Sequence, residues 1–101
     1  MVTPLSKKNF DESVLKKGGR AAVKFWSATC LPCKQLAPIY EQLSNELEDL
    51  IFYEVNTSEE PGLVSDYRIM GVPTVILFEN GEIIRRKTGM QSKRELRDFL
   101  Q

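Results

Sequence analysis

Apolar residues occur along the chain in separate runs, and the spacing within each run predicts an element of secondary structure. Residues 21–26, 50–55 and 75–78 are almost continuously apolar, as are strands that are covered on both faces of a sheet. The third run leads through Asn80-Gly81 to residues 83–87, and Asn-Gly favours the positive φ angles of a tight hairpin. The pattern therefore predicts four strands, of which the last two are antiparallel.

Two longer segments have the spacing of amphipathic helices. From about residue 30 to residue 47, apolar side chains recur at steps of three and four residues, which favours a helix packed on the sheet. Residues 92–101 repeat this pattern, and Ser92 with Glu95 forms a capping box at their start. The inward-facing residues of this last helix are expected to be Leu96, Phe99 and Leu100.

Two shorter helices complete the set of predicted elements. Asn9 and Glu12 have the spacing of a capping box, for a helix that ends at Gly18-Gly19. Residues 59–67 predict a further short helix that begins near Pro61, because proline suits a first helical turn. Strands and helices thus alternate and end in a hairpin and a helix, which indicates an α/β architecture with a mixed sheet.

The length and charge of the chain limit the classes of function that need to be considered. With 101 residues, of which 42% are hydrophobic, we expect a single compact domain over residues 1–101. Fourteen basic and fourteen acidic residues balance, so no net field attracts nucleic acid or an anionic membrane. Residues 1–8 lack the apolar run of a secretory signal, and no stretch is long enough to span a bilayer. We expect a cytoplasmic protein with a local site.

Both cysteines of the chain, Cys30 and Cys33, lie in one C-x-x-C motif. Cys30 follows a predicted strand and opens a predicted helix, where unpaired N–H groups and the helix dipole favour the thiolate. Such a position lowers the pKa of a cysteine thiol toward neutrality or below, which makes it a nucleophile. Cys33 lies one helical turn further on, where it can resolve a mixed disulfide formed by Cys30, and Pro32 stiffens the turn between them.

A C-x-x-C motif can also be a zinc site or an inert pair. A structural zinc site usually needs four ligands, and the chain has no further cysteine and no histidine. An inert local pair of buried cysteines needs no further residue. A strand followed by C-x-x-C at a helix start is, however, the context of redox motifs, and this favours thiol-disulfide exchange.

Residues 25–34 read Phe-Trp-Ser-Ala-Thr-Cys-Leu-Pro-Cys-Lys, and this run resembles the pattern F-W-A-x-W-C-G-P-C-K of the thioredoxin family. The resemblance covers essentially the whole chain, with further matches at Ala37-Pro38, Pro61-Gly62, Gly71-Val72-Pro73-Thr74, Phe78-Glu79-Asn80-Gly81 and Gly89. It implies the thioredoxin fold, a central mixed β-sheet of about five strands flanked by helices.

The resemblance also implies roles for individual residues. Cys30 becomes the nucleophile and Cys33 the resolving thiol, and Pro73 is expected to be cis and to lie beside them. Val72 is expected to offer its backbone to an extended substrate segment, as a sheet edge accepts a strand. Trp26 is either the aromatic floor of the site or an ordinary core residue. The remaining substrate contacts implied by the resemblance are Thr29, Leu31, Pro32, Gly89 and Met90.

The partners implied by the resemblance are disulfide-containing substrate proteins and an electron donor of the thioredoxin-reductase type. No cofactor, metal, nucleic acid or membrane is implied, and we expect a monomer. The leading hypothesis is therefore a reductase of protein disulfides that a dedicated reductase regenerates. An oxidant or isomerase is disfavoured because cytoplasmic thiols are kept reduced. A binding module that keeps the fold, or a specialised redox partner with altered specificity, is the alternative.

Four positions around the motif depart from the family pattern. Thr29 and Leu31 replace the usual tryptophan and glycine beside the first cysteine. Thr57 and Thr88 stand where the docking patch of the family tends to be apolar. Leu31 and Met90 restore some apolar area, so we expect a relocated patch and an altered contact surface.

A last departure concerns two charges. Lys24 and Glu54 each interrupt an otherwise apolar strand, at positions where thioredoxins usually keep an aspartate and a lysine, respectively. Two opposite charges in buried strands suggest an ion pair next to Cys33. Alternatively, either side chain reaches water from a strand end. If the pair forms, the Glu54 carboxylate is the candidate base for Cys33, and the Lys24 ammonium favours its thiolate.

Overall fold

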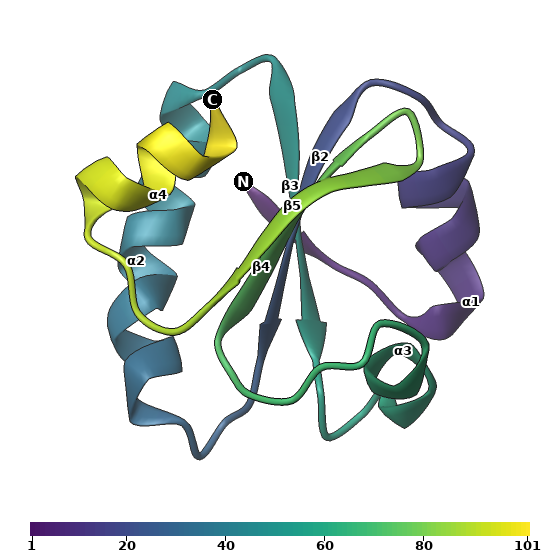
Figure 1. Cartoon of the computed structure of the whole chain (residues 1–101), viewed down its shortest axis with the longest axis horizontal. Coiled ribbons are helices and arrows are strands. Elements are labelled where there is room, and N and C mark those ends of the chain that lie inside the picture. Colours follow the sequence, from purple (N-terminus) through teal and green to yellow (C-terminus); the bar gives the residue numbers. More distant parts are fainter.

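The computed structural model describes residues 1–101 and contains one five-stranded sheet between two layers of helices (Figure 1). The strands are β1 (Val2–Pro4), β2 (Arg20–Trp26), β3 (Leu50–Asn56), β4 (Thr74–Glu79) and β5 (Glu82–Thr88), in the spatial order β1-β3-β2-β4-β5. β1 and β2 are parallel to β3, whereas β4 is antiparallel to β2 and β5 is antiparallel to β4. The mixed sheet expected from the sequence is confirmed.

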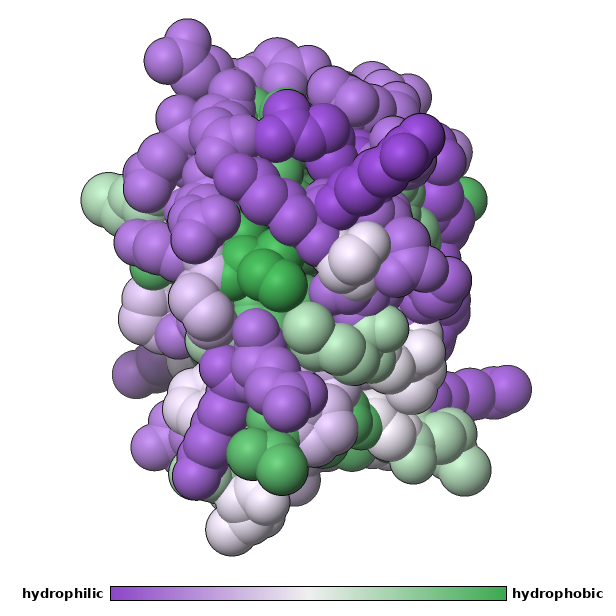
Figure 2. All heavy atoms as spheres, turned by 90° about the vertical axis from the view of Figure 1, so that its left-hand side faces the viewer, coloured by the Kyte–Doolittle hydropathy of each residue, from purple (hydrophilic) through white to green (hydrophobic).

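The helices lie on the two faces of this sheet (Figure 1). One layer holds α2 (Leu31–Glu46) and α4 (Lys93–Leu100), and the other holds α1 (Lys7–Phe10) and α3 (Pro61–Asp66). α1 continues directly as a π-helical segment, η1 (Asp11–Leu15). Figure 2 looks onto the side that carries α2 and α4, where hydrophilic residues dominate and hydrophobic ones show only as small patches. No helix is long and apolar enough to cross a membrane.

Each face of the sheet has its own hydrophobic core, and β2 contributes to both. Val23 and Phe25 join the cluster on the side of α1 and α3, whereas Ala22 joins the cluster that includes Tyr40 of α2. Successive side chains of a strand point to opposite faces, so Lys24 lies on the same face as Ala22. The sequence prediction that this strand is covered on both sides is therefore confirmed, and Lys24 lies inside the molecule with 4% exposure.

The N-terminal segment differs from the sequence prediction in two respects. The apolar pattern does not predict β1, whose three residues pair only with the distant β3. The first helix begins at Lys7 and not at Asn9, and Ser6 is its N-cap. Asn9 is the third helical residue, where its Oδ1 accepts a hydrogen bond from the Ser6 N–H at 2.9 Å. The capping box expected between Asn9 and Glu12 is therefore wrong, because Asn9 completes a box that starts at Ser6.

Other predicted elements agree closely with the structure. Asn80 and Gly81 have φ angles of 51° and 85° and form the turn between β4 and β5. Ser92 caps α4, and its hydroxyl and the Glu95 carboxylate each accept a hydrogen bond from the other residue's N–H. β3 is covered less completely than expected, since Ile51 keeps 40% of its surface exposed.

Candidate active site around Cys30 and Cys33

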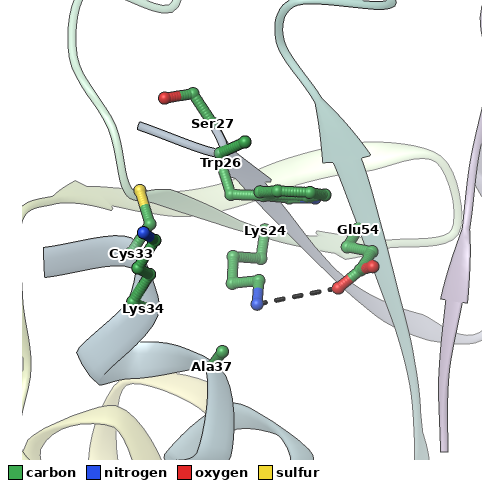
Figure 3. Close-up of a pocket in the computed structure, with 8 residues that line it drawn as sticks. Lys24, Trp26, Ser27, Cys33, Lys34, Ala37 and Glu54 are labelled. Atoms are coloured by element: carbon green, nitrogen blue, oxygen red, sulfur yellow. Dashed lines mark ion pairs between the residues drawn. The ribbon is translucent and has the colours of Figure 1, made fainter. Parts of the chain in front are cut away.

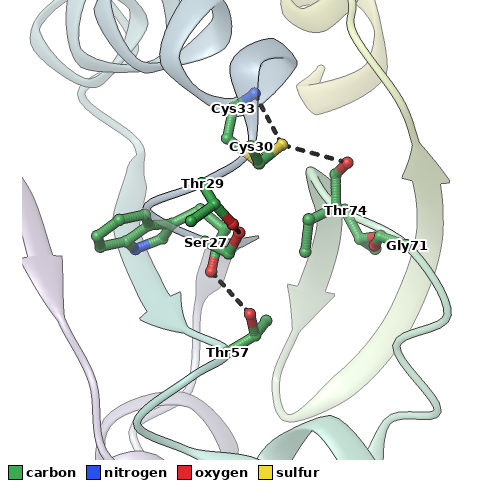
Figure 4. The surroundings of a disulfide bond; sticks show 9 residues. Ser27, Thr29, Cys30, Cys33, Thr57, Gly71 and Thr74 are labelled. Atoms are coloured by element: carbon green, nitrogen blue, oxygen red, sulfur yellow. Dashed lines mark hydrogen bonds between the residues drawn. A yellow bond between two sulfur atoms is a disulfide. The ribbon is translucent and has the colours of Figure 1, made fainter.

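Cys30 and Cys33 form a disulfide where the chain passes from β2 into α2 (Figure 4). Cys30 is the N-cap residue of α2, with an extended backbone, and its Sγ accepts a hydrogen bond from the Cys33 N–H at 3.1 Å. Pro32 stands in the first turn, where the N–H that proline lacks has no helical partner in any case. The strand-to-helix context expected for this motif is therefore present.

The two cysteines differ in their access to solvent. Cys33 is 3% exposed and faces the interior, whereas Cys30 is only half-buried. Leu31 and Pro32, between them, are exposed, and Leu31 keeps 65% of its surface in contact with water. A partner protein can therefore reach the Cys30 sulfur, while Cys33 is covered by the protein itself.

A second chain segment reaches the disulfide from the start of β4. The Val72–Pro73 peptide bond is cis, as the resemblance implied. The Val72 carbonyl oxygen lies 3.5 Å from Cys30 Sγ, and the buried Pro73 accepts a hydrogen bond from the Gly89 N–H at 2.8 Å. Met90 follows directly and is 42% exposed. The structure thus brings together three segments that are far apart in the sequence.

Hydroxyl groups surround the motif, and most of them bond to the protein itself. The Thr57 hydroxyl donates to the carbonyl oxygen of Trp26 at 3.1 Å (Figure 4). The Thr74 hydroxyl donates to the Gly71 carbonyl at 2.6 Å and lies 2.9 Å from that of Thr88. The Thr57 and Thr88 hydroxyls, which the sequence suggested as polar groups of the docking patch, are therefore largely satisfied internally.

Thr29 has a different environment from these threonines. It is exposed, and its only polar neighbour is the Ser27 hydroxyl at 3.4 Å. Together with the exposed Leu31 it gives the surface beside Cys30 one hydroxyl and one branched apolar side chain.

A cavity of about 350 Å³ lies beneath Cys33 (Figure 3). Its lining comes from β2, from β3 and from the start of α2, and comprises Lys24, Trp26, Ser27, Ala28, Cys33, Lys34, Ala37 and Glu54. Lys24 and Glu54 are direct neighbours across the parallel pair β2 and β3, and Lys24 Nζ lies 3.6 Å from Glu54 Oε1. The ion pair suggested by the sequence is thus present beside Cys33. It is not fully buried, because the Glu54 side chain keeps 28% of its surface exposed.

Burial shifts the pKa values of two side chains in or near this cavity. It lowers the pKa of Lys24 from its usual value, whereas the nearby carboxylates of Glu54 and Glu41 raise that pKa by a smaller amount. The ammonium also lies 4.9 Å from the centre of the Tyr40 ring. Burial raises the pKa of Tyr40 well above its usual value, so this phenol remains protonated. Its hydroxyl donates to the Tyr53 carbonyl at 2.7 Å.

Trp26 forms part of the cavity wall, and its role as the aromatic floor of the site stays a prediction. The residue is half-buried, and its indole Nε1 is buried without a hydrogen-bond partner. It is therefore both a packed residue and a surface of the space beside Cys33.

A second groove, of about 330 Å³, lies beside the Val72 backbone and was not foreseen from the sequence. Its walls come from the turn after β3, from α3 and from the loop that follows α3, and comprise Thr57, Pro61, Val64, Ile69, Met70, Gly71 and Val72. Met70 is 94% exposed, the highest exposure among the large hydrophobic residues. A methionine directly before Gly71-Val72-Pro73 was the available indication in the sequence.

Comparison with known proteins agrees with this arrangement. The thioredoxin family model matches residues 1–101. A thioredoxin of Buchnera aphidicola subsp. Acyrthosiphon pisum is 40% identical over 100 residues, which are 98% of this chain and 93% of the relative. Thioredoxins of Rickettsia bellii and Rickettsia prowazekii are each 38% identical over 101 residues, 99% of this chain and 96% of each relative.

A redox-active pair at a helix start, next to a cis-proline and on a five-stranded mixed sheet, defines a thiol-disulfide oxidoreductase. The chain belongs to the thioredoxin family. It is a protein-disulfide reductase that works with disulfide-containing proteins and a reductase.

Proposed function

We propose that Cys30 attacks the disulfides of substrate proteins, that Cys33 resolves the mixed disulfide, and that a dedicated thioredoxin-type reductase regenerates the dithiol. The observation that carries this order is the difference in exposure: Cys30 is half-buried at the helix start, whereas Cys33 is 3% exposed. Helix N-terminal N–H groups favour a thiolate at Cys30 in the reduced protein.

The exchange is balanced in two steps. The Cys30 thiolate attacks one sulfur of the substrate disulfide, forms a mixed disulfide and releases the other substrate sulfur as a thiolate. Cys33 then loses its proton and attacks Cys30 Sγ, so that the Cys30–Cys33 bond forms and the second substrate sulfur leaves. The substrate disulfide is reduced to two thiols, and the protein dithiol is oxidised to the disulfide seen in the structure.

The surface around Cys30 supports binding of an extended substrate segment. Val72 presents its carbonyl oxygen 3.5 Å from Cys30 Sγ, a suitable place for a substrate strand to run alongside the Val72 backbone. Pro73 and Gly89 hold this loop by their hydrogen bond, and Leu31 and Met90 offer exposed apolar contacts. Thr29, Pro32 and Trp26 complete the proposed contact set. We expect the protein to act as a monomer in the cytoplasm, where thiols are kept reduced.

Insulin reduction tests the activity. Wild-type protein, with dithiothreitol as electron donor, should accelerate the precipitation of the insulin B chain, and Cys30→Ser should abolish the acceleration. A Cys30→Ser variant with wild-type activity would contradict the proposal.

Alkylation tests the order of the two cysteines. Iodoacetamide at mildly acidic pH should label Cys30 of the reduced protein faster than Cys33, as peptide mass analysis of quenched samples would show. Faster labelling of Cys33 would reverse the assigned roles.

A further inference from the structure

The cavity beneath Cys33 connects a shielded thiol to a carboxylate that water can reach. Cys33 and Glu54 line the same space, and Lys24 lies between α2 and Glu54 (Figure 3). Two of the wall residues, Ala28 and Ala37, carry only a methyl group. With a volume of about 350 Å³ the cavity is wide enough for water, which needs polar partners of the kind that Lys24 and Glu54 supply.

Cys33 needs a proton acceptor when it resolves the mixed disulfide, and the protein shields it from solvent. An ammonium ion has no free electron pair, so a Lys24 that is paired with Glu54 cannot take the proton. The Tyr40 phenol stays protonated, and its hydroxyl is bonded to the Tyr53 carbonyl. Glu54 is the remaining group of the cavity with a basic oxygen.

The position of the cation gives this transfer a favourable charge balance. Before the transfer, the Lys24 ammonium pairs with the Glu54 carboxylate at 3.6 Å. After the transfer, Glu54 is neutral, and the negative charge lies on Cys33, a residue that lines another side of the same cavity. One anion accompanies the buried cation in both states, so the step leaves no unpaired buried charge.

We propose that Glu54 accepts the proton of Cys33 during the resolving step and that Lys24 pairs first with the Glu54 carboxylate and then with the Cys33 thiolate. This proposal rests on the roles assigned above to Cys30 and Cys33. The proton passes across the cavity to Glu54, and the freed electron pair of Cys33 attacks Cys30 Sγ. The bond to the substrate sulfur breaks, the substrate thiolate leaves, and Glu54 returns its proton to solvent through its exposed side.

Other charged groups near the cavity fit this assignment. Lys34 lines the cavity from α2 but is exposed, so water screens its charge. Glu41 of α2 acts on Lys24 from a distance, is exposed, and does not line the cavity. β4 places the apolar Val75 opposite Lys24, and β1 places Pro4 opposite Glu54. Glu41 is therefore a matched control for Glu54.

Stopped-flow reaction with 5,5′-dithiobis(2-nitrobenzoate) separates the two steps. Attack by Cys30 releases one coloured thionitrobenzoate with a rate that depends on reagent concentration. Resolution by Cys33 releases the second thionitrobenzoate with a first-order rate that does not depend on reagent concentration. Because thionitrobenzoate leaves as a thiolate without needing a proton, the first-order phase reports the deprotonation and attack of Cys33.

Glu54→Gln should slow the first-order phase about 100-fold near neutral pH, and the remaining rate should rise about tenfold per pH unit as hydroxide takes over. The concentration-dependent phase should keep its wild-type rate, which also shows that the variant is folded. Lys24→Met should shift the pH profile of the first-order phase upward, because the thiolate loses its cation. Glu41→Gln should leave both phases unchanged.

A first-order phase in Glu54→Gln with the wild-type rate and pH profile would overturn the proposal. If Glu54→Gln does not fold, Glu54→Asp keeps the charge but shortens the side chain. It should then slow the first-order phase alone, and a wild-type first-order phase would equally overturn the proposal. A failure of this proposal can be told apart from a failure of the proposed function. The proposed function requires only that Cys30→Ser loses the concentration-dependent attack, whatever the Glu54 variants do.

Discussion

Among single residues, Lys24 is the one charged side chain that is buried, and its contribution to stability depends on Glu54. Burial lowers the pKa of Lys24, so the ion pair offsets only part of the desolvation of the ammonium. Glu54→Gln leaves this cation without its partner and should lower the free energy of unfolding by about 3–5 kcal/mol. Lys24→Met leaves a carboxylate that water reaches and should cost about 1–2 kcal/mol. Urea unfolding of both variants measures the difference.

The double variant distinguishes an interacting pair from two independent sites. Because the first substitution already removes the interaction, the combined loss should be smaller than the sum of the single losses by more than about 0.5 kcal/mol. Losses that add to within this margin would contradict the pair.

Gln91 differs from Lys24 in that it is a buried polar residue whose side chain has no hydrogen-bond partner. The residue is 1% exposed, and neither its Oε1 nor its Nε2 has a hydrogen-bond partner. Such groups cost about 1–3 kcal/mol, so Gln91→Leu should raise the free energy of unfolding by that amount. Thermal unfolding should show a rise of about 4–8 °C per kcal/mol. The exposed Gln42→Leu should change stability by less than about 0.5 kcal/mol, and an equal gain there would show that burial of the amide is not the cause.

Site residues could be predicted from the sequence where the evidence for them lies within a few neighbouring positions, and less well where it depends on contacts between distant segments. Cys30 and Cys33 are only three positions apart and needed only the strand and helix around them. Lys24 and Glu54 were noticed because a charge interrupts each apolar strand, yet their contact depends on the register of two strands about thirty residues apart. Met70 was missed because its groove exists only where α3 meets the loop before β4.

At the scale of whole elements, prediction succeeded where a hydrophobic pattern is long and failed where it is short. β2 and β4 carry apolar runs, and α2 carries apolar residues at helical spacing, and these patterns decide both the type of each element and its buried face. β1 has three residues and gains its hydrogen bonds from β3, a partner that no local pattern reveals. The start of α1 was misplaced because serine and asparagine are both good N-cap residues, and in the structure Ser6 is the N-cap while Asn9 is the third helical residue.

The turn between β4 and β5 makes a prediction at this scale. Gly81 has a φ of +85°, and a Cβ placed there would lie 2.5 Å from the Leu15 carbonyl oxygen. Gly19 has a φ of +81°, but a Cβ there would meet nothing within 4 Å. Gly19→Ala should therefore cost about 1–2 kcal/mol for backbone strain alone. Gly81→Ala should cost about 2 kcal/mol more, because η1 and the hairpin must separate. Equal losses in urea unfolding would show that the close approach to Leu15 is unimportant.

At the scale of the whole molecule, buried tyrosines should govern stability at high pH. Burial raises the pKa values of Tyr40, Tyr53 and Tyr67 above the usual 10.0. The unfolded chain loses these protons first, so the stability present below pH 10 should fall as the pH rises further. Lys24 acts in the opposite direction, because its lowered pKa makes the unfolded chain the better proton binder below 10.5. The opposing contribution of Lys24 ends near its unfolded pKa of 10.5, so above that pH the tyrosines alone act and the stability falls.

Tyr40→Phe tests this balance, because Tyr40 is fully buried. The variant should lose about 1 kcal/mol at neutral pH, when the hydrogen bond to the Tyr53 carbonyl disappears. Above about pH 10 its stability should fall less steeply than that of the wild type. Tyr67→Phe, at a half-buried position, should flatten the curve less. Urea unfolding across this range measures both slopes, and parallel curves for Tyr40→Phe and wild type would exclude Tyr40 as the cause.

The surface that surrounds Cys30 should decide which reductase regenerates the protein. Thr29 and Leu31 are both exposed, and they replace the tryptophan and glycine of the family pattern. A reductase shaped for an aromatic ring therefore meets a hydroxyl and a branched side chain instead. We predict that a standard NADPH-dependent thioredoxin reductase turns over this protein with a kcat/KM at least about tenfold below that of a typical thioredoxin, the effect of losing about 1.4 kcal/mol of contact energy. Thr29→Trp combined with Leu31→Gly should recover much of that loss.

Reaction with 5,5′-dithiobis(2-nitrobenzoate) serves as the control for this prediction. A small reagent does not use the docking surface, so the wild type and the double variant should reduce it at similar rates. Wild-type turnover equal to that of a typical thioredoxin would show that these two positions do not govern recognition, and a double variant that gains nothing would place the determinant elsewhere on the surface.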